Sequence, residues 1–131
     1  MPSSERVSPA PDRDPPTILV IDDEPAILAL VRDILADEGY TVLVATDGEE
    51  GLLHAQRTAP DLILTDLMLP GLDGYTLCRI LRAEARTAQT PVIAMSAAYR
   101  PQAGVAFDAV LAKPFELDTL LSVIRAYLGS P

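Results

Sequence analysis

The chain has 131 residues, of which 49% are hydrophobic and 22% charged, a composition that indicates one globular domain and excludes disorder throughout. Nineteen acidic residues against ten basic ones give a formal net charge of −9, which argues against direct binding of nucleic acid or of an anionic membrane surface. The single cysteine excludes an internal disulfide, and the short apolar runs predict a cytoplasmic protein that does not cross a membrane.

The first sixteen residues differ in composition from the remainder of the chain. They contain five of its twelve prolines and few apolar residues, which is typical of a disordered segment. We therefore expect a disordered, proline-rich tail over residues 1–16, followed by a single domain over residues 17–131.

From Thr17 onward, short apolar runs alternate with longer segments of helical periodicity. The runs are mostly apolar on both faces, as in a buried parallel sheet, and predict strands over residues 18–21, 42–45, 62–64, 92–95 and 110–112. Helices are predicted over residues 24–38, from a capping box at Asp47 onward, over 74–86 and over 116–128. This alternation predicts an α/β fold with a doubly wound, five-stranded parallel sheet in the flavodoxin-like strand order 2-1-3-4-5.

Polar or charged residues follow four of the five predicted strands. Asp22 and Asp23 follow the first strand, Asp66 the third, Ser96 the fourth and Lys113, the only lysine, the fifth. Ligands of doubly wound sheets bind at the carboxyl ends of the strands, so we expect these side chains to converge there. Crowded carboxylates favour Mg2+, and a lysine, a hydroxyl and a carboxylate nucleophile complete the parts of a phosphoryl-transfer site.

Each of these residues also has a purely structural interpretation. Asp22 and Asp23 would suit a helix N-terminus, Asp66 a turn, Ser96 a helix cap and Lys113 a solvated strand end. A shared site is favoured because all of them fall on the same edge of the predicted sheet.

Four segments resemble, in chain order, the receiver domain of two-component response regulators: VIDDEPAI, DLILTDLMLPGLDGYTLCRILR, PVIAMSA and LAKPF. The resemblance covers about residues 17–128 and implies a CheY-like fold with Asp66 as the phosphoacceptor. It also implies that Asp23, Asp66 and the backbone carbonyl of Met68 bind Mg2+ directly, while Asp22 acts on the metal through water.

The same resemblance assigns the switch residues. It implies that Ser96 bonds the phosphoryl group and drives the switch, that Lys113 pairs with a phosphoryl oxygen, and that the Lys113–Pro114 peptide bond is cis. The family usually has Tyr or Phe three residues before the lysine as the partner of the switch hydroxyl. Here that position is Val110, so this chain departs from the family pattern.

The segment that should contain the family's fourth helix is short. Because it carries Pro101 and Gly104, we expect this helix to be short or absent. We also expect phosphorylation to change the order of residues 97–109 rather than the rotamer at position 110. Tyr99 and Phe107 lie in this segment. Two interpretations are open for them: that one of them replaces the missing switch aromatic, and ordinary packing, which is favoured.

The resemblance implies a stand-alone receiver domain rather than a turnover enzyme. Its expected partners are a histidine kinase or histidine phosphotransfer protein as phosphodonor and a downstream protein that the sequence does not identify. The oligomeric state is open. Two alternatives also stay open: a degenerate receiver that binds partners without phosphorylation, and an aspartate-nucleophile phosphohydrolase, which usually carries an acid at the position of Met68.

Overall fold

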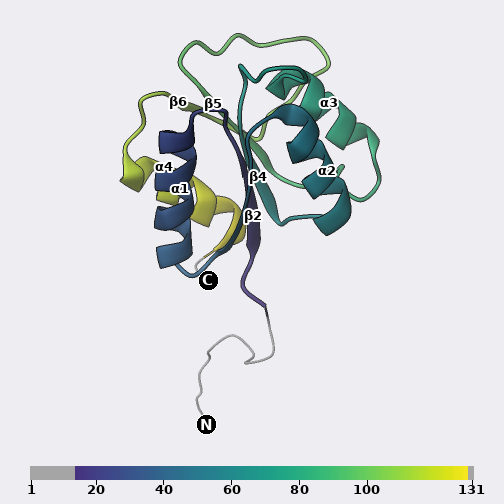
Figure 1. Cartoon of the computed structure of the whole chain (residues 1–131). Helices are drawn as coiled ribbons and strands as arrows, with labels where there is room; N and C mark the ends of the chain where they lie inside the picture. The colour runs from purple at the N-terminus through teal and green to yellow at the C-terminus, as the bar shows by residue number, and fades with distance from the viewer. Residues whose placement is uncertain (1–13, 130–131) are drawn as a thin grey trace.

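The computed structural model describes residues 14–129 as strands and helices that alternate along the chain (Figure 1). The strands are β2 (Thr17–Ile21), β3 (Thr41–Ala45), β4 (Leu62–Asp66), β5 (Val92–Ser96) and β6 (Ala109–Ala112). The helices are α1 (Pro25–Asp37), α2 (Gly48–Thr58), α3 (Gly74–Ala83) and α4 (Leu117–Leu128). The tail predicted over residues 1–16 lies almost entirely outside the described residues. No helix between residues 14 and 129 is long and apolar enough to cross a membrane.

The strands form one parallel sheet in the order β3-β2-β4-β5-β6. Counted along the chain this is the predicted order 2-1-3-4-5, so the predicted fold class is confirmed. All carboxyl ends of the strands point to the same edge of the sheet, because every neighbouring pair is parallel.

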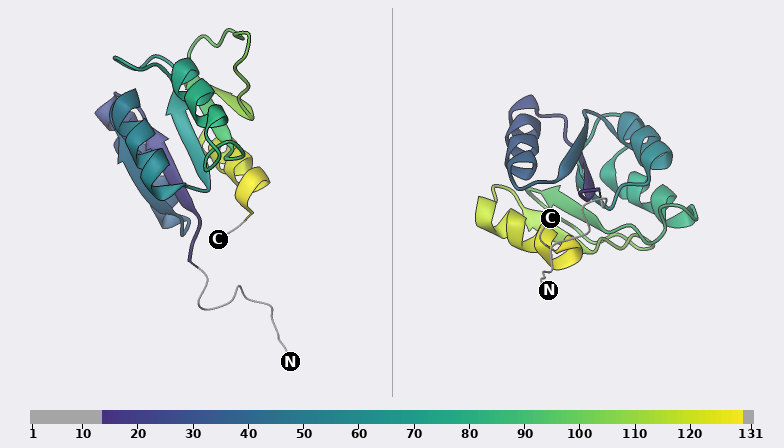
Figure 2. Two further views of the ribbon diagram at one scale, coloured as in Figure 1. Left: turned by 90° about the vertical axis from the view of Figure 1, so that its right-hand side faces the viewer. Right: turned by 90° about the horizontal axis from the view of Figure 1, so that it is seen from below.

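Helices cover both faces of the sheet (Figure 2), and a hydrophobic core lies on each face. α1 and α4 cover one face, where Leu35 and Ile124 pack with Val20 of β2. α2 and α3 cover the other face, where Leu77 packs with Leu19 of the same strand. Successive residues of β2 therefore enter different cores, which explains why this strand is apolar at every position.

Side-chain caps begin two of the helices. The Asp47 carboxylate accepts the Glu50 N–H at 2.7 Å at the start of α2, as the predicted capping box requires. The Asp73 carboxylate accepts the Thr76 N–H at 2.8 Å at the start of α3. Both caps lie at the edge of the sheet that carries the carboxyl ends of the strands, and they fix the loops there.

α3 ends at Ala83 rather than at Arg86, where the sequence pattern placed its end. Thr87 accounts for the difference. Its hydroxyl donates to the Leu81 carbonyl at 2.7 Å and its N–H donates to the Glu84 carbonyl at 3.1 Å. These bonds form a turn that replaces the next helical hydrogen bonds, since side chains of this type compete locally with helix formation.

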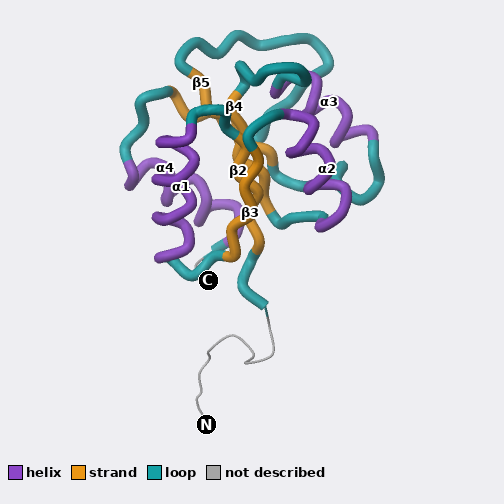
Figure 3. Tube along the Cα trace, viewed as in Figure 1, coloured by secondary structure: helices purple, strands orange, loops and turns teal. Residues whose placement is uncertain are grey.

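Residues 97–108 all lie in the described part of the chain and form no helix (Figure 3). The prediction that the fourth helix of the family is short or absent is therefore confirmed. The segment instead runs as an extended loop with Gly104 at a φ of 78°, and its Val105 and Phe107 side chains pack against the core beneath α2 and α3. The edge of the sheet that carries the carboxyl ends of the strands is thus bordered by a loop where the resemblance implies a helix.

Gly48 begins α2 at a point where the helix lies directly against the loop that follows β4. A Cβ atom at this position would lie 1.9 Å from the backbone oxygen of Leu72. We expect Gly48→Ala to lower the free energy of unfolding by about 1–3 kcal/mol, because the loop has to move. Chemical denaturation measures the change, with Leu53→Ala at an exposed position of the same helix as the control. Unchanged stability of Gly48→Ala would contradict this close approach.

Candidate functional site

Four strand ends deliver the predicted site residues to one edge of the sheet. Asp22 and Asp23 directly follow β2, and Asp66 ends the neighbouring strand β4. Ser96 ends β5, and Lys113 directly follows β6, where its backbone N–H donates to the Ser96 carbonyl at 2.8 Å. The four strands are neighbours in the sheet, so the tertiary structure brings residues together that are up to 91 positions apart.

Three carboxylates form an acidic cluster at this edge. One oxygen of each of Asp22, Asp23 and Asp66 lies within 4.8 Å of the other two. Asp22 and Asp66 are buried, whereas Asp23 is exposed. Negative charges at this spacing repel one another, most strongly where burial removes water. The cluster therefore requires positive charge for its stability.

Lys113 supplies part of that charge. Its Nζ lies 2.8 Å from Asp22 Oδ2, 3.3 Å from Glu24 Oε1 and 3.4 Å from Asp66 Oδ2. Burial alone would lower the pKa of Lys113, but the hydrogen bond and charge of Asp22, followed by the charge of Asp66, outweigh it and raise the pKa above its ordinary value. The site thus holds a charged ammonium group beside the predicted phosphoacceptor.

The charge on Asp66 is incompletely compensated. Burial raises the pKa of the Asp66 carboxyl above its ordinary value, and the negative charge of Asp22 acts in the same direction. The Lys113 ammonium opposes this shift, as does the Met68 N–H, which donates to Asp66 Oδ1 at 3.4 Å. A ligand that brings further positive charge to this carboxylate would stabilise its ionised form.

Asp22 bonds two groups at once. Its Oδ1 accepts the Glu24 N–H at 2.9 Å, while its Oδ2 accepts from Lys113. Glu24 is the N-cap residue of α1, and its own side chain makes no capping hydrogen bond. A role for Asp22, Asp23 and Glu24 at the N-terminus of α1 therefore explains only the hydrogen bond of Asp22 Oδ1. It does not explain the positions of the Asp23 and Glu24 carboxylates.

Ser96 is buried beside the cluster, and its Oγ accepts the Ala98 N–H at 3.0 Å. It is not a helix cap, because residues 97–108 form no helix. Val110 lies on β6 and is 38% exposed. Its neighbour Leu111 faces the core beneath α1 and α4, so strand alternation directs Val110 to the opposite face, which no helix covers at this point.

Met68 follows the acceptor strand on the solvent side of the site. Its side chain is 77% exposed, and its N–H donates to the Asp66 carboxylate. A thioether carries no proton to transfer, so this side chain brings no acid or base chemistry to the site.

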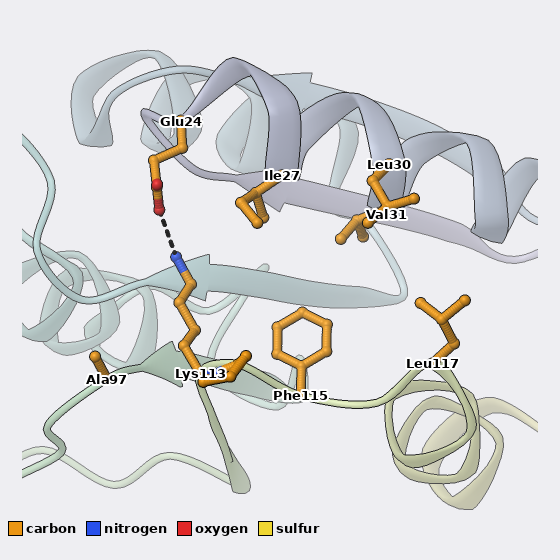
Figure 4. A pocket seen from close by; sticks show the side chains of 9 residues that line it. Glu24, Ile27, Leu30, Val31, Ala97, Lys113, Phe115 and Leu117 are labelled. Carbon is orange, nitrogen blue, oxygen red and sulfur yellow. Dashed lines mark hydrogen bonds and ion pairs between the residues drawn. The ribbon is translucent and has the colours of Figure 1, made fainter.

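Glu24 is the site residue that the sequence pattern did not identify. Its carboxylate is the solvent-side partner of Lys113, as Figure 4 shows. The signal in the sequence was its place directly after Asp22 and Asp23, which also suits an acid near a helix N-terminus. Only the position of Lys113, directly after β6, shows that Glu24 is a site residue as well as a residue at a helix N-terminus.

A groove of about 510 Å3 leads away from the site between α1 and the loop that joins β6 to α4 (Figure 4). Glu24 and Lys113 lie at the end of the groove that meets the acidic cluster. Elsewhere its lining is apolar and consists of Ile27, Leu30, Val31, Ala97, Pro114, Phe115 and Leu117. The Lys113–Pro114 peptide bond, which begins this loop, is cis.

The donor set of the cluster suits Mg2+. This ion prefers oxygen ligands and is usually held by one or two carboxylates together with water and phosphate oxygens. Asp23 provides an exposed carboxylate, Asp66 one that keeps 7% exposure, and Asp22 one that is fully buried. The three residues therefore fit a magnesium ion by charge, by ligand type and by spacing.

We expect Asp23→Ala to weaken Mg2+ binding by about tenfold or more, since loss of even an outer partner of a metal site costs about that much. The free energy of unfolding without metal should stay the same or rise, because one of three repelling charges is removed. Calorimetric titration and denaturation measure the two effects, with Asp33→Ala on the exposed side of α1 as the control. A destabilised variant with unchanged Mg2+ affinity would instead indicate a role at the helix N-terminus.

Sequence comparisons with known proteins agree with this geometry. The family model described as response regulator receiver domain matches residues 18–125. The DNA-binding dual master transcriptional regulator RpaA of Synechocystis sp. is 44% identical over 118 residues, which cover 86% of this chain and 49% of RpaA. The DNA-binding response regulator MtrA of Mycolicibacterium smegmatis is 35% identical over 117 residues, covering 85% and 50%. The chain thus spans about half the length of these curated relatives.

Solved structures give the same fold. The chemotaxis response regulator CheY4 of Vibrio cholerae superposes with a TM-score of 0.81 at 29% identity, covering 87% of this chain and 99% of that one. The receiver domain of the sensor histidine kinase PA1611 from Pseudomonas aeruginosa PAO1 gives a TM-score of 0.80 at 31% identity, covering 88% and 99%. That receiver domain was solved with a magnesium ion coordinated in its active-site cleft.

Proposed function

The chain belongs to the family of response regulator receiver domains, and we propose that it accepts a phosphoryl group on Asp66 in a Mg2+-dependent reaction. The observation that carries this proposal is the meeting of Asp66 with two further carboxylates and the Lys113 ammonium at one edge of the sheet. A phosphoryl-transfer site needs these parts, namely a nucleophile, a metal site and a cation.

In the proposed reaction an oxygen of the Asp66 carboxylate attacks the phosphorus atom of the donor. The bond from phosphorus to the donor nitrogen or oxygen breaks as the new P–O bond forms, and the leaving group keeps the electron pair of the broken bond. The product is an acyl phosphate on Asp66. No proton has to leave the nucleophile, because the carboxylate attacks in its ionised form.

Lys113 and Ser96 hold the transferred group. The Lys113 ammonium lies 3.4 Å from Asp66 and bonds a phosphoryl oxygen as charge develops on it. The Ser96 hydroxyl donates to a second phosphoryl oxygen. Ser96 Oγ has to turn toward Asp66 for this, which alters its hydrogen bond with the Ala98 N–H.

Asp23, Asp66 and the backbone carbonyl of Met68 are the groups we assign to Mg2+, with Asp22 acting through water. When bound, the ion neutralises charge on the phosphoryl oxygens and orients them toward the nucleophile. Asp22 keeps Lys113 in place from the opposite side through the bond of 2.8 Å. The buried pair thereby orients the ammonium toward the acceptor.

The groove beside the site supports a protein as phosphodonor. Its apolar lining ends at Glu24 and Lys113, so a partner helix that fills it would bring a phosphohistidine to Asp66. We propose a histidine kinase or a histidine phosphotransfer protein as this partner, within the cytoplasm. The downstream partner is a protein in this proposal.

The DNA-binding activity named for RpaA and MtrA belongs to proteins about twice as long as the matched region. The net charge of −9 makes phosphate-backbone binding by this chain unfavourable. We therefore propose that the receiver domain itself makes no contact with nucleic acid.

Both alternative functions have less support. A phosphohydrolase of the aspartate-nucleophile type would need an acid or base at Met68, whose side chain has neither. A degenerate receiver would not need the acidic cluster, the buried lysine and the buried hydroxyl, all of which this chain keeps at one site.

Incubation of the chain with Mg2+ and acetyl phosphate tests the proposal. We expect a mass gain of one phosphoryl group that is absent when a chelator is added. The adduct should be lost in alkali or hydroxylamine, as an acyl phosphate is, and should map to Asp66. An alkali-stable adduct on Ser96, or steady release of phosphate with no adduct at any time, would contradict the proposal.

A further inference from the structure

The loop between β5 and β6 is tied to α3 along one face of that helix. The Tyr75 hydroxyl donates to the Arg100 carbonyl at 2.8 Å, and the Arg100 N–H lies 3.3 Å from the same phenol oxygen. Cys78 Sγ donates to the Ala106 carbonyl at 3.6 Å, and Arg82 bonds Asp108 at 2.6 Å. Because the three helix residues are spaced i, i+3 and i+7, they lie in a row facing the loop.

Three aromatic rings meet at Tyr75, the N-terminal end of this row. The ring of Tyr75 stacks with Tyr99 at a centroid distance of 6.5 Å and meets the edge of Phe107 at 5.8 Å. Tyr99 and Phe107 are 6.2 Å apart with their planes at 75°. These distances and angles are those of interacting aromatic pairs. Tyr99 and Phe107 therefore contact each other, and both contact Tyr75 of α3.

This aromatic cluster is connected both to the phosphoacceptor Asp66 and to the switch hydroxyl of Ser96. Tyr75 directly follows Gly74, whose Cα lies so close to the acceptor strand that a Cβ there would be 2.6 Å from the Asp66 carbonyl. Tyr99 directly follows Ala98, whose N–H donates to Ser96 Oγ at 3.0 Å. The cluster thus joins the chain that follows the acceptor to the chain that follows the switch hydroxyl.

The residue at the usual aromatic position cannot serve this purpose. Val110 has no ring and a restricted side-chain rotamer, and it is 38% exposed on a strand face without a covering helix. A movement of Ser96 therefore has no aromatic side chain on β6 to act upon. The aromatic ring nearest to Ala98 along the chain is that of Tyr99, which belongs to the aromatic cluster.

We propose that the Tyr75–Tyr99–Phe107 cluster is the conformational switch of this receiver, in place of an aromatic residue at position 110. The cluster is packed while Ser96 Oγ accepts from Ala98. It rearranges when the Ser96 hydroxyl turns to the phosphoryl group, and the loop over residues 97–108 changes position with it. This inference rests on the proposed phosphorylation of Asp66.

Coupling between the aromatic cluster and phosphoryl binding at Asp66 can be measured as a change in binding affinity. If phosphorylation disfavours the packed cluster, then a substitution that destabilises the packed cluster should strengthen phosphoryl binding. Tyr75→Leu and Phe107→Leu each remove one ring without touching Asp66 or Ser96. Both should bind the phosphoryl mimic beryllofluoride, in the presence of Mg2+, about fivefold or more tightly than the unchanged chain.

Fluorine NMR provides a readout that does not depend on a variant with altered stability. The chain contains four tyrosines, and labelling with 3-fluorotyrosine gives each a resonance that Tyr→Phe variants assign. Beryllofluoride with Mg2+ should shift the resonances of Tyr75 and Tyr99. Tyr40 is the matched control, because its hydroxyl also donates to a backbone carbonyl, that of Gly129, but at the opposite edge of the sheet. Its resonance should stay unchanged.

The outcomes separate this inference from the proposed function. Beryllofluoride binding at Asp66 with unmoved Tyr75 and Tyr99 resonances, or with the same affinity in both leucine variants, would overturn the cluster as the switch and leave phosphorylation intact. Failure of the unchanged chain to bind beryllofluoride in Mg2+ would overturn both. Shifted cluster resonances with tighter binding in the variants is the result that the proposal requires.

Discussion

Asp66→Asn is expected to abolish phosphorylation of the chain by acetyl phosphate in the presence of Mg2+. The amide oxygen of asparagine carries no charge and is a far weaker nucleophile than a carboxylate. The substitution also removes one ligand of the proposed metal site and one of the three carboxylates that Lys113 contacts. Intact-protein mass spectrometry should show no alkali-labile adduct, because the variant lacks the proposed nucleophile.

Asp73→Asn is the matched control for this substitution. It makes the same chemical change seven residues later, where the side chain accepts the Thr76 N–H as the N-cap of α3. Asparagine serves as an N-cap about as well as aspartate, so this variant should fold and be phosphorylated normally. Loss of the adduct in both variants, or its persistence in Asp66→Asn, would contradict the assignment of Asp66.

Asp66→Asn should also stabilise the metal-free protein at neutral pH. Burial raises the pKa of Asp66 in the folded state, so the wild-type chain loses stability as the pH rises through that folded pKa. The asparagine variant lacks this loss. Its advantage in denaturation should therefore be largest near neutral pH and should shrink as the pH falls toward the ordinary carboxyl range. An advantage that grew on acidification would have the wrong sign.

Lys113→Met is expected to have the largest effect on stability among the site substitutions. Asp22 is fully buried, and the Lys113 ammonium, 2.8 Å from its Oδ2, is its only ion-pair partner among residues 14–129. Removing one member of a buried ion pair costs about 3–5 kcal/mol, since the remaining charge has no compensation. Methionine keeps most of the side-chain volume, so the loss reports charge rather than packing. Urea denaturation without metal measures it.

The same variant should transfer phosphoryl groups roughly 100-fold more slowly, as expected when a charged donor is removed from a developing oxyanion. Arg32→Met is the matched control, because Arg32 pairs with Asp33 where both side chains are at least half exposed. Exposed pairs contribute about 0–1 kcal/mol, so the control should stay near wild type in both measurements. Equal stability changes in the two variants would mean that Lys113 is a solvated strand end.

Several features of the fold could be predicted from local sequence signals. The five strands coincide with short apolar runs of the sequence. The capping pattern at Asp47 predicts the start of α2, where the Asp47 carboxylate accepts the Glu50 N–H. The alternation of strands and helices predicts a parallel sheet, and five strands in one small domain favour the order 2-1-3-4-5. The convergence of Asp22, Asp66 and Lys113 then follows from topology, because parallel neighbouring strands deliver their carboxyl ends to one edge.

Other features depend on contacts between distant residues, which leave no periodic signal in the sequence. The end of α3 at Ala83 depends on the hydroxyl of Thr87 reaching the Leu81 carbonyl, although no glycine or proline interrupts the sequence between Tyr75 and Thr90. Glu24 suits a helix terminus in the sequence, and it becomes a partner of Lys113 only because β6 places that lysine opposite it. The partner of a side chain therefore depends on how the strands are arranged in the sheet, whereas the position of a strand depends on local sequence.

The aromatic cluster is the clearest example of this difference. Tyr99 and Phe107 are visible in the sequence as isolated aromatic residues of a loop without helical pattern, and Tyr75 as one position of an amphipathic helix. Their rings meet because the loop that replaces a helix has to satisfy its backbone groups elsewhere, and the phenol of Tyr75 binds two of them at Arg100. Local propensity specifies that no helix forms between residues 97 and 108, whereas the path that the loop takes is set by the donors and rings that α3 presents to it.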